Sequence, residues 1–225
     1  MDIVTPPGNT DSTHQIDPPK ILDATLEESE SALRSVPTVL CAPFAAIDCE
    51  TTGLDASKHE AVSVAVVLAD RNLLEVAHFY QLIIPQRLHL ASLEALVICG
   101  YSAEAWEAGG AVTPEIAASL LASWLRGRRP IAHSLDFDKR FFAGVLRAAK
   151  QNPPWSSFGF CTLDAARKAR STGKLASKSA KLVDVAEHLK LPFERQEGAP
   201  HSALDDARAC LAVARSFRAK GWMKI

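Results

Sequence analysis

Two acidic side chains in the run FAAIDCETTGL are the first residues of this chain with a clear chemical use. Asp48 and Glu50 stand two residues apart in a short apolar segment. Side chains of a β-strand alternate between its two faces, so both carboxylates would project from the same face. Burying like charges side by side is unfavourable unless a cation neutralises them. The pair therefore indicates a site for a hard divalent cation such as Mg²⁺ or Mn²⁺.

A further acid, Asp138, stands far downstream, in the run IAHSLDFDKRFF. We expect a strand to end at His133 and Asp138 to open a helix. The inward face of that helix would carry Phe141, Phe142 and Val145. An acid such as Asp138 in a first helical turn is also favourable through the helix dipole alone. A single D-x-E pair such as Asp48 and Glu50 is more often a surface or salt-bridged pair.

The third segment, HSALDDARACLAVA, places His201 five residues before Asp206, on either side of an expected helix start. A histidine beside a cluster of acids can act as a base, because its unperturbed pKa of about 6.5 lets it accept a proton at neutral pH. Ala203, Ala207 and Cys210 would form a face of small residues for close packing. Alone, such a histidine is more often a helix cap or a surface residue.

The elements that would position these residues follow from apolar patterning. Phe44 to Cys49, Ala61 to Ala69 and Leu73 to Ile84 predict three strands in an antiparallel meander. Helical spacing then predicts helices over Ser92 to Cys99, Ser102 to Ala108, Thr113 to Leu125, Asp138 to Lys150, Thr162 to Arg170, Lys181 to Leu189 and Ser202 to Ala219, with a short strand over Pro130 to His133. This order predicts an α/β fold with a mixed sheet flanked by helices.

The length of 225 residues suggests one domain plus an appendage. Residues 1–20 have four prolines among small polar residues, which predicts a flexible tail, and Asp23 to Val36 predicts a short helix. We therefore divide the chain into an N-terminal extension, residues 1–40, and a domain, residues 41–225.

Charge differs between these two parts. The extension has seven acids and two bases, a net charge of −5, so the remainder carries +4 of the total of −1. A mildly basic domain is compatible with a polyanionic substrate without proving one. The segment Arg167 to Lys181 contains six cations and no acid, which suits either contact with a phosphate backbone or a solvated loop. The acidic extension is a candidate for recruiting a protein partner.

The five cysteines are odd in number and scattered, which argues against a disulfide framework and a cysteine zinc site. No apolar run approaches the roughly 18 to 20 residues of a membrane span. We expect a cytoplasmic protein with no membrane partner.

Taken together, the three segments resemble the DEDDh, or DnaQ-like, family of 3′–5′ exonucleases, whose fold is RNase H-like. Its first motif, DxETTGL, matches Asp48 to Leu54, the second matches Ala132 to Phe142, and the third, HxAxxDA, matches His201 to Ala207. The resemblance extends from Phe44 to about Phe217. It implies a mixed five-stranded sheet with three antiparallel N-terminal strands, flanked by helices.

The resemblance also implies roles for individual residues. Two Mg²⁺ or Mn²⁺ ions would be held by Asp48, Glu50, Asp138 and Asp206, and His201 would deprotonate the attacking water. The terminal nucleotide would be bordered by Thr51, Thr52, Gly53, Leu54, His133 and Ser134. Ser134 stands where the family usually has Asn, which leaves the role of that position open.

The function implied is removal of nucleoside 5′-monophosphates from single-stranded or frayed 3′ ends, with DNA favoured over RNA, in repair, processing or proofreading. Two alternatives stay open on the sequence. One is a 3′–5′ exoribonuclease or oligoribonuclease with the same chemistry. The other is a nucleic-acid-binding polymerase-accessory module in which catalysis is secondary.

Overall fold

A computed structural model describes residues 41–193 and 198–225 of the chain. The tail expected over residues 1–20 and the helix expected over Asp23 to Val36 lie outside the described residues. All of the elements below belong to residues 44–219.

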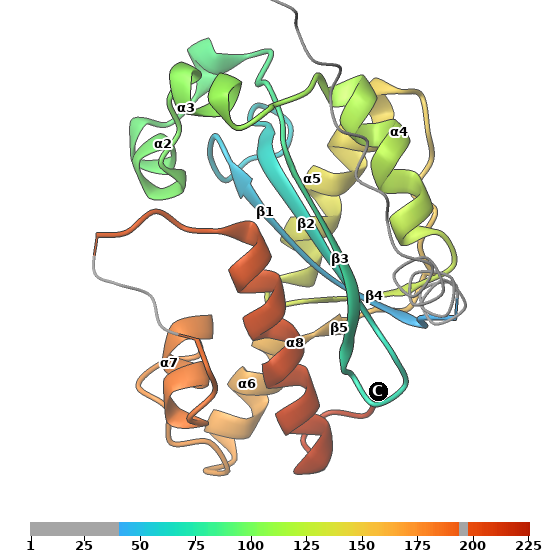
Figure 1. Ribbon diagram of the computed structural model, residues 1–225. Helices are drawn as coiled ribbons and strands as arrows, with labels where there is room; N and C mark the ends of the chain where they lie inside the picture. Colours follow the sequence, from blue (N-terminus) through green and yellow to red (C-terminus); the bar gives the residue numbers. More distant parts are fainter. Residues whose placement is uncertain (1–40, 194–197) are drawn as a thin grey trace, which may run out of the picture. The chain divides into compact units, whose positions relative to one another are not determined.

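The centre of the domain is a five-stranded sheet with strand order β3-β2-β1-β4-β5 (Figure 1). Its strands are β1 (Phe44–Thr51), β2 (Ala61–Ala69), β3 (Glu75–Leu82), β4 (Arg129–Ala132) and β5 (Phe160–Cys161). The first three pair antiparallel, whereas β4 runs parallel to β1 and β5 parallel to β4. The predicted mixed sheet with three antiparallel N-terminal strands is confirmed.

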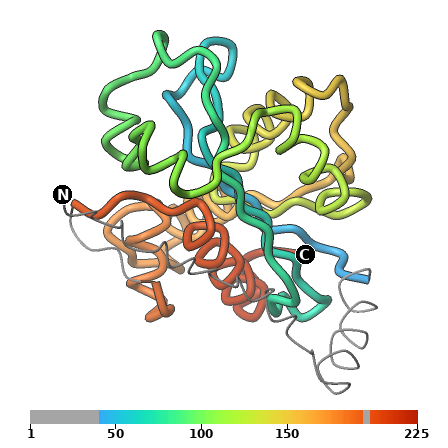
Figure 2. Tube along the Cα trace, turned by 45° about the horizontal axis from the view of Figure 1, so that its top comes forward, coloured from blue at the N-terminus to red at the C-terminus, as the bar shows by residue number. Residues whose placement is uncertain are grey.

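Helices cover both faces of this sheet, and Figures 1 and 2 show α8 on one side with α4 and α5 on the other. The helices are η1 (Leu88–Leu90), α2 (Leu93–Cys99), α3 (Ala103–Ala108), α4 (Pro114–Leu125), α5 (Leu135–Ala148), α6 (Thr162–Ser171), α7 (Leu182–His188) and α8 (Ala203–Ala219). Because both faces are covered, all nine residues of β2 are buried. That burial explains why β2 is apolar apart from Ser63 and shows no polar alternation.

The alternation of β1 divides the core into two layers. Ala45, Ile47 and Cys49 pack in the cluster that contains the inner faces of α4 and α5. Phe44 and Ala46 pack in the cluster formed with α8. The even-numbered series continues to Asp48 and Glu50, so the strand geometry directs both acids toward the α8 side.

The small-residue face expected on α8 is confirmed. Ala203, Ala207 and Cys210 are each fully buried in the cluster shared with Ala46 and Ala65 of the sheet. Short side chains on both surfaces let a helix approach a strand closely. The first turn of α8 therefore lies against the strand that carries the first motif.

The predicted start of α5 at Asp138 is wrong, because the helix begins three residues earlier. Ser134 is its N-cap residue, and the backbone N–H of Asp138 donates to the carbonyl oxygen of Ser134 at 3.1 Å, which is a helical hydrogen bond. Asp138 is the fourth helical residue. The strand before it ends at Ala132, which leaves His133 in the connection.

The other differences are small. β3 is shorter than the predicted Leu73 to Ile84 because Leu73 takes a positive φ of 61° in the turn that follows β2. β5 and η1 were not located in the sequence, and each has only two or three residues. All five cysteines are free thiols. Within the described ranges, no helix has the length and apolarity to span a bilayer.

Candidate metal and catalytic site

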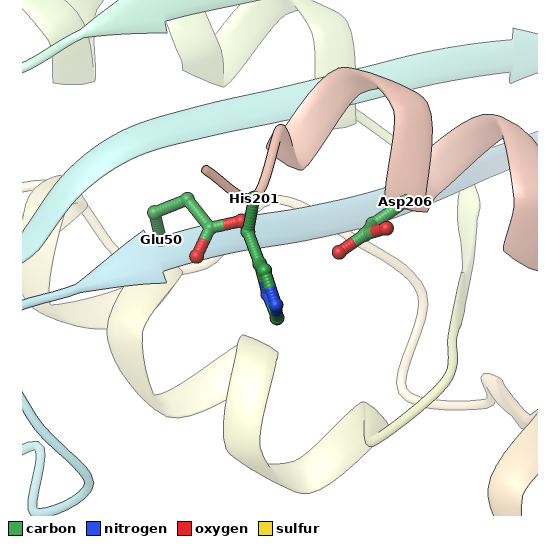
Figure 3. A group of neighbouring side chains, drawn as sticks. All are labelled: Glu50, His201 and Asp206. Atoms are coloured by element: carbon green, nitrogen blue, oxygen red, sulfur yellow. The ribbon is translucent and has the colours of Figure 1, made fainter. Parts of the chain in front are cut away.

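Three residues from distant parts of the chain meet at one place beside β1. Glu50, His201 and Asp206 each offer one ligand atom, and these three atoms lie within 4.8 Å of one another. Figure 3 shows Glu50 on its strand, His201 just before α8 and Asp206 in the first turn of α8, with the imidazole between the two carboxylates. The structure thus brings the first and third motifs together.

The segment around the start of α8 has well-defined backbone anchors. Ser202 caps the helix, and its carbonyl oxygen accepts from the Asp206 N–H at 2.9 Å. One residue earlier, the N–H of His201 donates to the carbonyl oxygen of Ile98 at 2.8 Å. His201 is therefore held between α8 and the last turn of α2.

Asp48 completes the even-numbered face of β1 and is half-buried there. Its charge contributes to the raised pKa values of the buried thiols of Cys49 and Cys210, after the larger effect of burial. Cys210 belongs to α8, so Asp48 lies between the strand and that helix, on the side where Asp206 stands.

Asp138 stands on α5 and is only 3% exposed, and it is not part of the group formed by Glu50, His201 and Asp206. The thiol of Cys49 donates to its Oδ1 at 3.5 Å. Burial raises the pKa of Asp138, and the nearby charge of Glu50 raises it further, although hydrogen bonds from Cys49 and Ser134 oppose the shift. The second motif therefore contacts the first through Cys49, the residue between Asp48 and Glu50.

These acids fit a bound divalent metal. Glu50, Asp138 and Asp206 are 8%, 3% and 7% exposed, and burial, with a further contribution from the charge of Glu50, raises the pKa of Asp138. A cation among them would favour the charged form of each carboxylate and offset the free-energy cost of burying them. Carboxylate oxygens with one imidazole suit Mg²⁺ or Mn²⁺.

The loop from Thr51 to Glu60 starts at an irregularity in the sheet, because the pairing of β1 with β2 shifts register between Glu50 and Thr51. The Thr51 hydroxyl donates to the carbonyl oxygen of Gly53 at 2.8 Å, and the Thr52 hydroxyl accepts from the Glu60 N–H at 2.9 Å. Both threonines are buried. Their side chains therefore support the loop from inside.

Gly53 is required by packing within the same loop. A Cβ atom at this position would lie 2.6 Å from the His59 ring. The side chain of Leu54, by contrast, is 81% exposed, four residues after Glu50 in sequence. Of the four loop residues expected to border a nucleotide, Leu54 is the one that presents its side chain outward.

His133 has internal partners at both ring nitrogens. Nδ1 lies 2.9 Å from the Thr162 hydroxyl and Nε2 lies 2.9 Å from the carbonyl oxygen of Ala180. Because a carbonyl only accepts, the proton is assigned to Nε2. Burial lowers the pKa of His133 to about 4, so the ring is neutral and joins β4 to the segment before α7. Ser134, half-buried, is the N-cap of α5.

One feature near the site was not foreseen in the sequence. Leu93 and Val97 of α2 are 81% and 78% exposed. The helix is attached at both ends to the site, because Ser92 N–H donates to Thr52 O at 2.8 Å while Ile98 O accepts from His201. The sequence signal was available: LEALVIC has apolar residues on every side of a helix that buries only Cys99.

Comparisons with known proteins agree with this geometry. The model of the RNase T family, described as exonuclease, matches residues 45–214. Among solved structures, exonuclease I from Methylocaldum szegediense is 19% identical, with a TM-score of 0.67 over 79% of this chain and 40% of that one. E. coli exonuclease I in complex with a dT13 oligonucleotide is 15% identical, with a TM-score of 0.66 over 78% of this chain and 40% of that one.

These structural matches establish a common fold. The chain spans about two-fifths of the length of the exonuclease I proteins it matches. No curated protein matches the chain in sequence.

Proposed function

Because this chain belongs to the RNase T exonuclease family, as its three motifs predict, we propose that it is a metal-dependent 3′–5′ exonuclease acting on DNA. The observation that carries the proposal is the convergence of Glu50, His201 and Asp206 within 4.8 Å. The product would be a nucleoside 5′-monophosphate. We assign this activity to residues 41–225. Residues 1–40 would form an extension that recruits a protein partner. The protein would act in the cytoplasm.

The metal site would consist of Asp48, Glu50, Asp138 and Asp206, with two Mg²⁺ or Mn²⁺ ions. When bound, such ions activate water and stabilise the charge that develops on a departing 3′-oxygen. The protein supplies three carboxylates that are at most 8% exposed and one that is half-buried. Their burial keeps the ligands in a fixed arrangement with little competing solvent.

His201 would act as general base. Its imidazole lies among the carboxylates, and its backbone is fixed by the hydrogen bond to Ile98. A neutral imidazole there can accept the proton of the attacking water, and the neighbouring carboxylates stabilise the imidazolium that results.

The terminal nucleotide would bind next to the loop of Thr51, Thr52, Gly53 and Leu54. The two threonines and the glycine maintain the loop, and the exposed side chain of Leu54 would contact the base. His133 and Ser134 would support the site from the β4–α5 connection. Complexes of exonuclease I with oligonucleotides, on the same fold, favour DNA as the substrate.

The test is degradation of single-stranded DNA and RNA, labelled at either end, in Mg²⁺, Mn²⁺ or EDTA. We expect stepwise, metal-dependent loss from the 3′ end, faster on DNA, and a large reduction in the His201→Ala variant. Faster degradation of RNA would instead identify an exoribonuclease. Tight binding without cleavage would reject the enzyme and favour an accessory module.

A further inference from the structure

Two adjoining cavities lie along α5, and none of the acids Asp48, Glu50, Asp138 and Asp206 lines either of them. Their volumes are about 460 Å³ and about 670 Å³. Ala56, Ser57 and Arg147 line both of them. Because they share these residues the two cavities are neighbours, and we call them together the α5 groove.

The helical wall of the α5 groove is basic. Lys139, Arg140 and Arg147 all line it. None of these three is in an ion pair among the residues that the structure describes. Their charges are therefore available to an anionic ligand.

The acids of the groove balance this charge only in part. Glu60 is already bound to Arg87, with 3.3 Å between its Oε1 and the Arg87 Nε and a further hydrogen bond to the Arg87 N–H. The other acids that line it are Glu115, at the start of α4, and Asp136, in the first turn of α5. The lining thus holds one more cation than acids, with Arg87, Lys139, Arg140 and Arg147 against Glu60, Glu115 and Asp136.

An aromatic ring completes the groove. Trp155, half-buried, lines the larger cavity beside Pro153. The Nζ of Lys139 lies 5.7 Å from the centre of the Trp155 ring. Cations along a depression together with an aromatic face are typical of surfaces that bind single-stranded nucleic acid, where the cations contact phosphates and the ring stacks on a base.

The groove is connected to the candidate metal site through two elements. The loop that follows β1 passes from Thr51 beside the site to Ala56 and Ser57 in the groove. On the other side, the first turns of α5 carry Asp138 inward and Arg140 outward. A strand whose 3′ end is at the acids would reach the groove by crossing the exposed side chain of Leu54.

We propose that the α5 groove binds the sugar–phosphate backbone of a single strand several nucleotides upstream of its 3′ end. The position of that 3′ end rests on the proposed exonuclease function. The groove would add affinity for long strands, whereas a strand of two or three nucleotides would occupy the metal site alone.

The test measures binding by fluorescence anisotropy in EDTA, so that no cleavage is needed, with single-stranded DNA of 3 and 15 nucleotides. The variant is Arg140→Gln with Arg147→Gln. We expect 15-nucleotide DNA to bind about tenfold more weakly and the slope of log K against log salt to fall by roughly 1.4, which is about 0.7 for each phosphate that the variant no longer neutralises. Binding of the 3-nucleotide strand should not change.

A matched control removes two cations from the basic segment Arg167 to Lys181, as Lys168→Gln with Lys174→Gln. This pair is also exposed and causes the same change of net charge. Far-ultraviolet circular dichroism checks that both variants are folded. Unchanged binding of the long strand, equally weakened binding of both strands, or weaker binding in the control pair alone would each overturn the proposal.

The outcome also separates the groove from the proposed activity. Suppose that the unaltered protein cleaves no nucleic acid, and that the Arg140 and Arg147 variant loses affinity for the long strand but not for the short one. The groove is then supported and the exonuclease function is rejected.

Discussion

The backbone N–H of His201 donates to the carbonyl oxygen of Ile98 at 2.8 Å, so the proposed general base is attached to the end of α2. The start of the same helix is attached to the loop after β1, through the hydrogen bond from Ser92 N–H to Thr52 O at 2.8 Å. A seven-residue helix thus links the two sides of the candidate site. Changes at either end of α2 should move catalytic groups without altering a metal ligand.

Replacement of Gly100 tests this link. Gly100 ends α2 with φ of 66°, and an added Cβ would lie 2.8 Å from the Pro200 side chain, one residue before His201. We expect Gly100→Ala to lower kcat about tenfold or more, because small displacements of a catalytic group are costly. Steady-state kinetics on labelled DNA would measure it.

Gly110 provides the control for backbone strain. It has φ of 71°, yet an added Cβ would meet no atom within 4 Å. Both alanine variants should lose about 1 kcal/mol of stability from the left-handed conformation. Equal kcat values for the two variants would show that contact with Pro200 does not position His201.

The His59 ring should limit what can replace Gly53. A Cβ there would lie 2.6 Å from the ring, so Gly53→Ala should displace the Thr51–Glu60 loop and raise KM for DNA. Adding His59→Ala removes the obstruction and should restore part of the affinity. If the double variant is no better than Gly53→Ala alone, the glycine is needed for contact with the substrate.

Asp138 should destabilise the metal-free protein as pH rises. Its pKa is raised, chiefly by burial, so the folded state keeps a proton that the unfolded state has lost. The unfolded carboxyl ionises at about 3.9, and stability therefore falls with increasing pH above that value. In EDTA, Asp138→Asn should remove this part of the pH dependence and be about 1 kcal/mol or more stabilising at pH 8.

The same substitution should reduce both the activity and the stabilisation by Mg²⁺. We expect activity to fall at least about 100-fold, and Mg²⁺ to raise the melting temperature less than in the unaltered protein, because a ligand is removed. Thermal unfolding with and without Mg²⁺ gives both comparisons. An Asn variant that is still stabilised fully by Mg²⁺ would remove Asp138 from the ligand set.

His133 should have the opposite pH dependence. Its folded pKa is lowered to about 4, by burial, against about 6.5 in the unfolded chain. The contribution of neutral His133 to the free energy of unfolding is complete above pH of about 6.5. It is lost as pH falls toward 4, by an amount on the order of 2 kcal/mol. Urea unfolding at several pH values should give a flatter profile for His133→Gln. Parallel profiles would show that the ring charges freely in the folded protein.

The sequence predicted those parts of the molecule that depend on periodicity. β2 lies at its predicted bounds, and the shared face of Asp48 and Glu50 follows from alternation alone. The spacing within the third motif selected His201 and Asp206. That this motif would meet the first one in space was predicted only by the family resemblance. A two-residue strand such as β5 has no period to detect.

Other details depend on contacts that no local pattern encodes. The start of α5 was misplaced because Ser134 makes no side-chain capping bond and the first turn holds two acids, Asp136 and Asp138, either of which could have opened the helix. The partners of His133 come from two segments distant in sequence, at Thr162 and Ala180. The α5 groove likewise requires Ala56 and Trp155 to face the same helix.

The alanine-rich contact between α8 and the sheet has a consequence for how the candidate site can change. Ala203 and Ala207 stand on either side of Asp206 in sequence and pack on the layer that contains Ala46. The separation between the carboxylate on the helix and those on the strand is therefore set by the thickness of methyl groups. Exchanging one of these methyl groups for a larger side chain would move the Asp206 carboxylate away from those of the strand. A residue that does not contact the proposed metal ion would then favour a cation of larger radius.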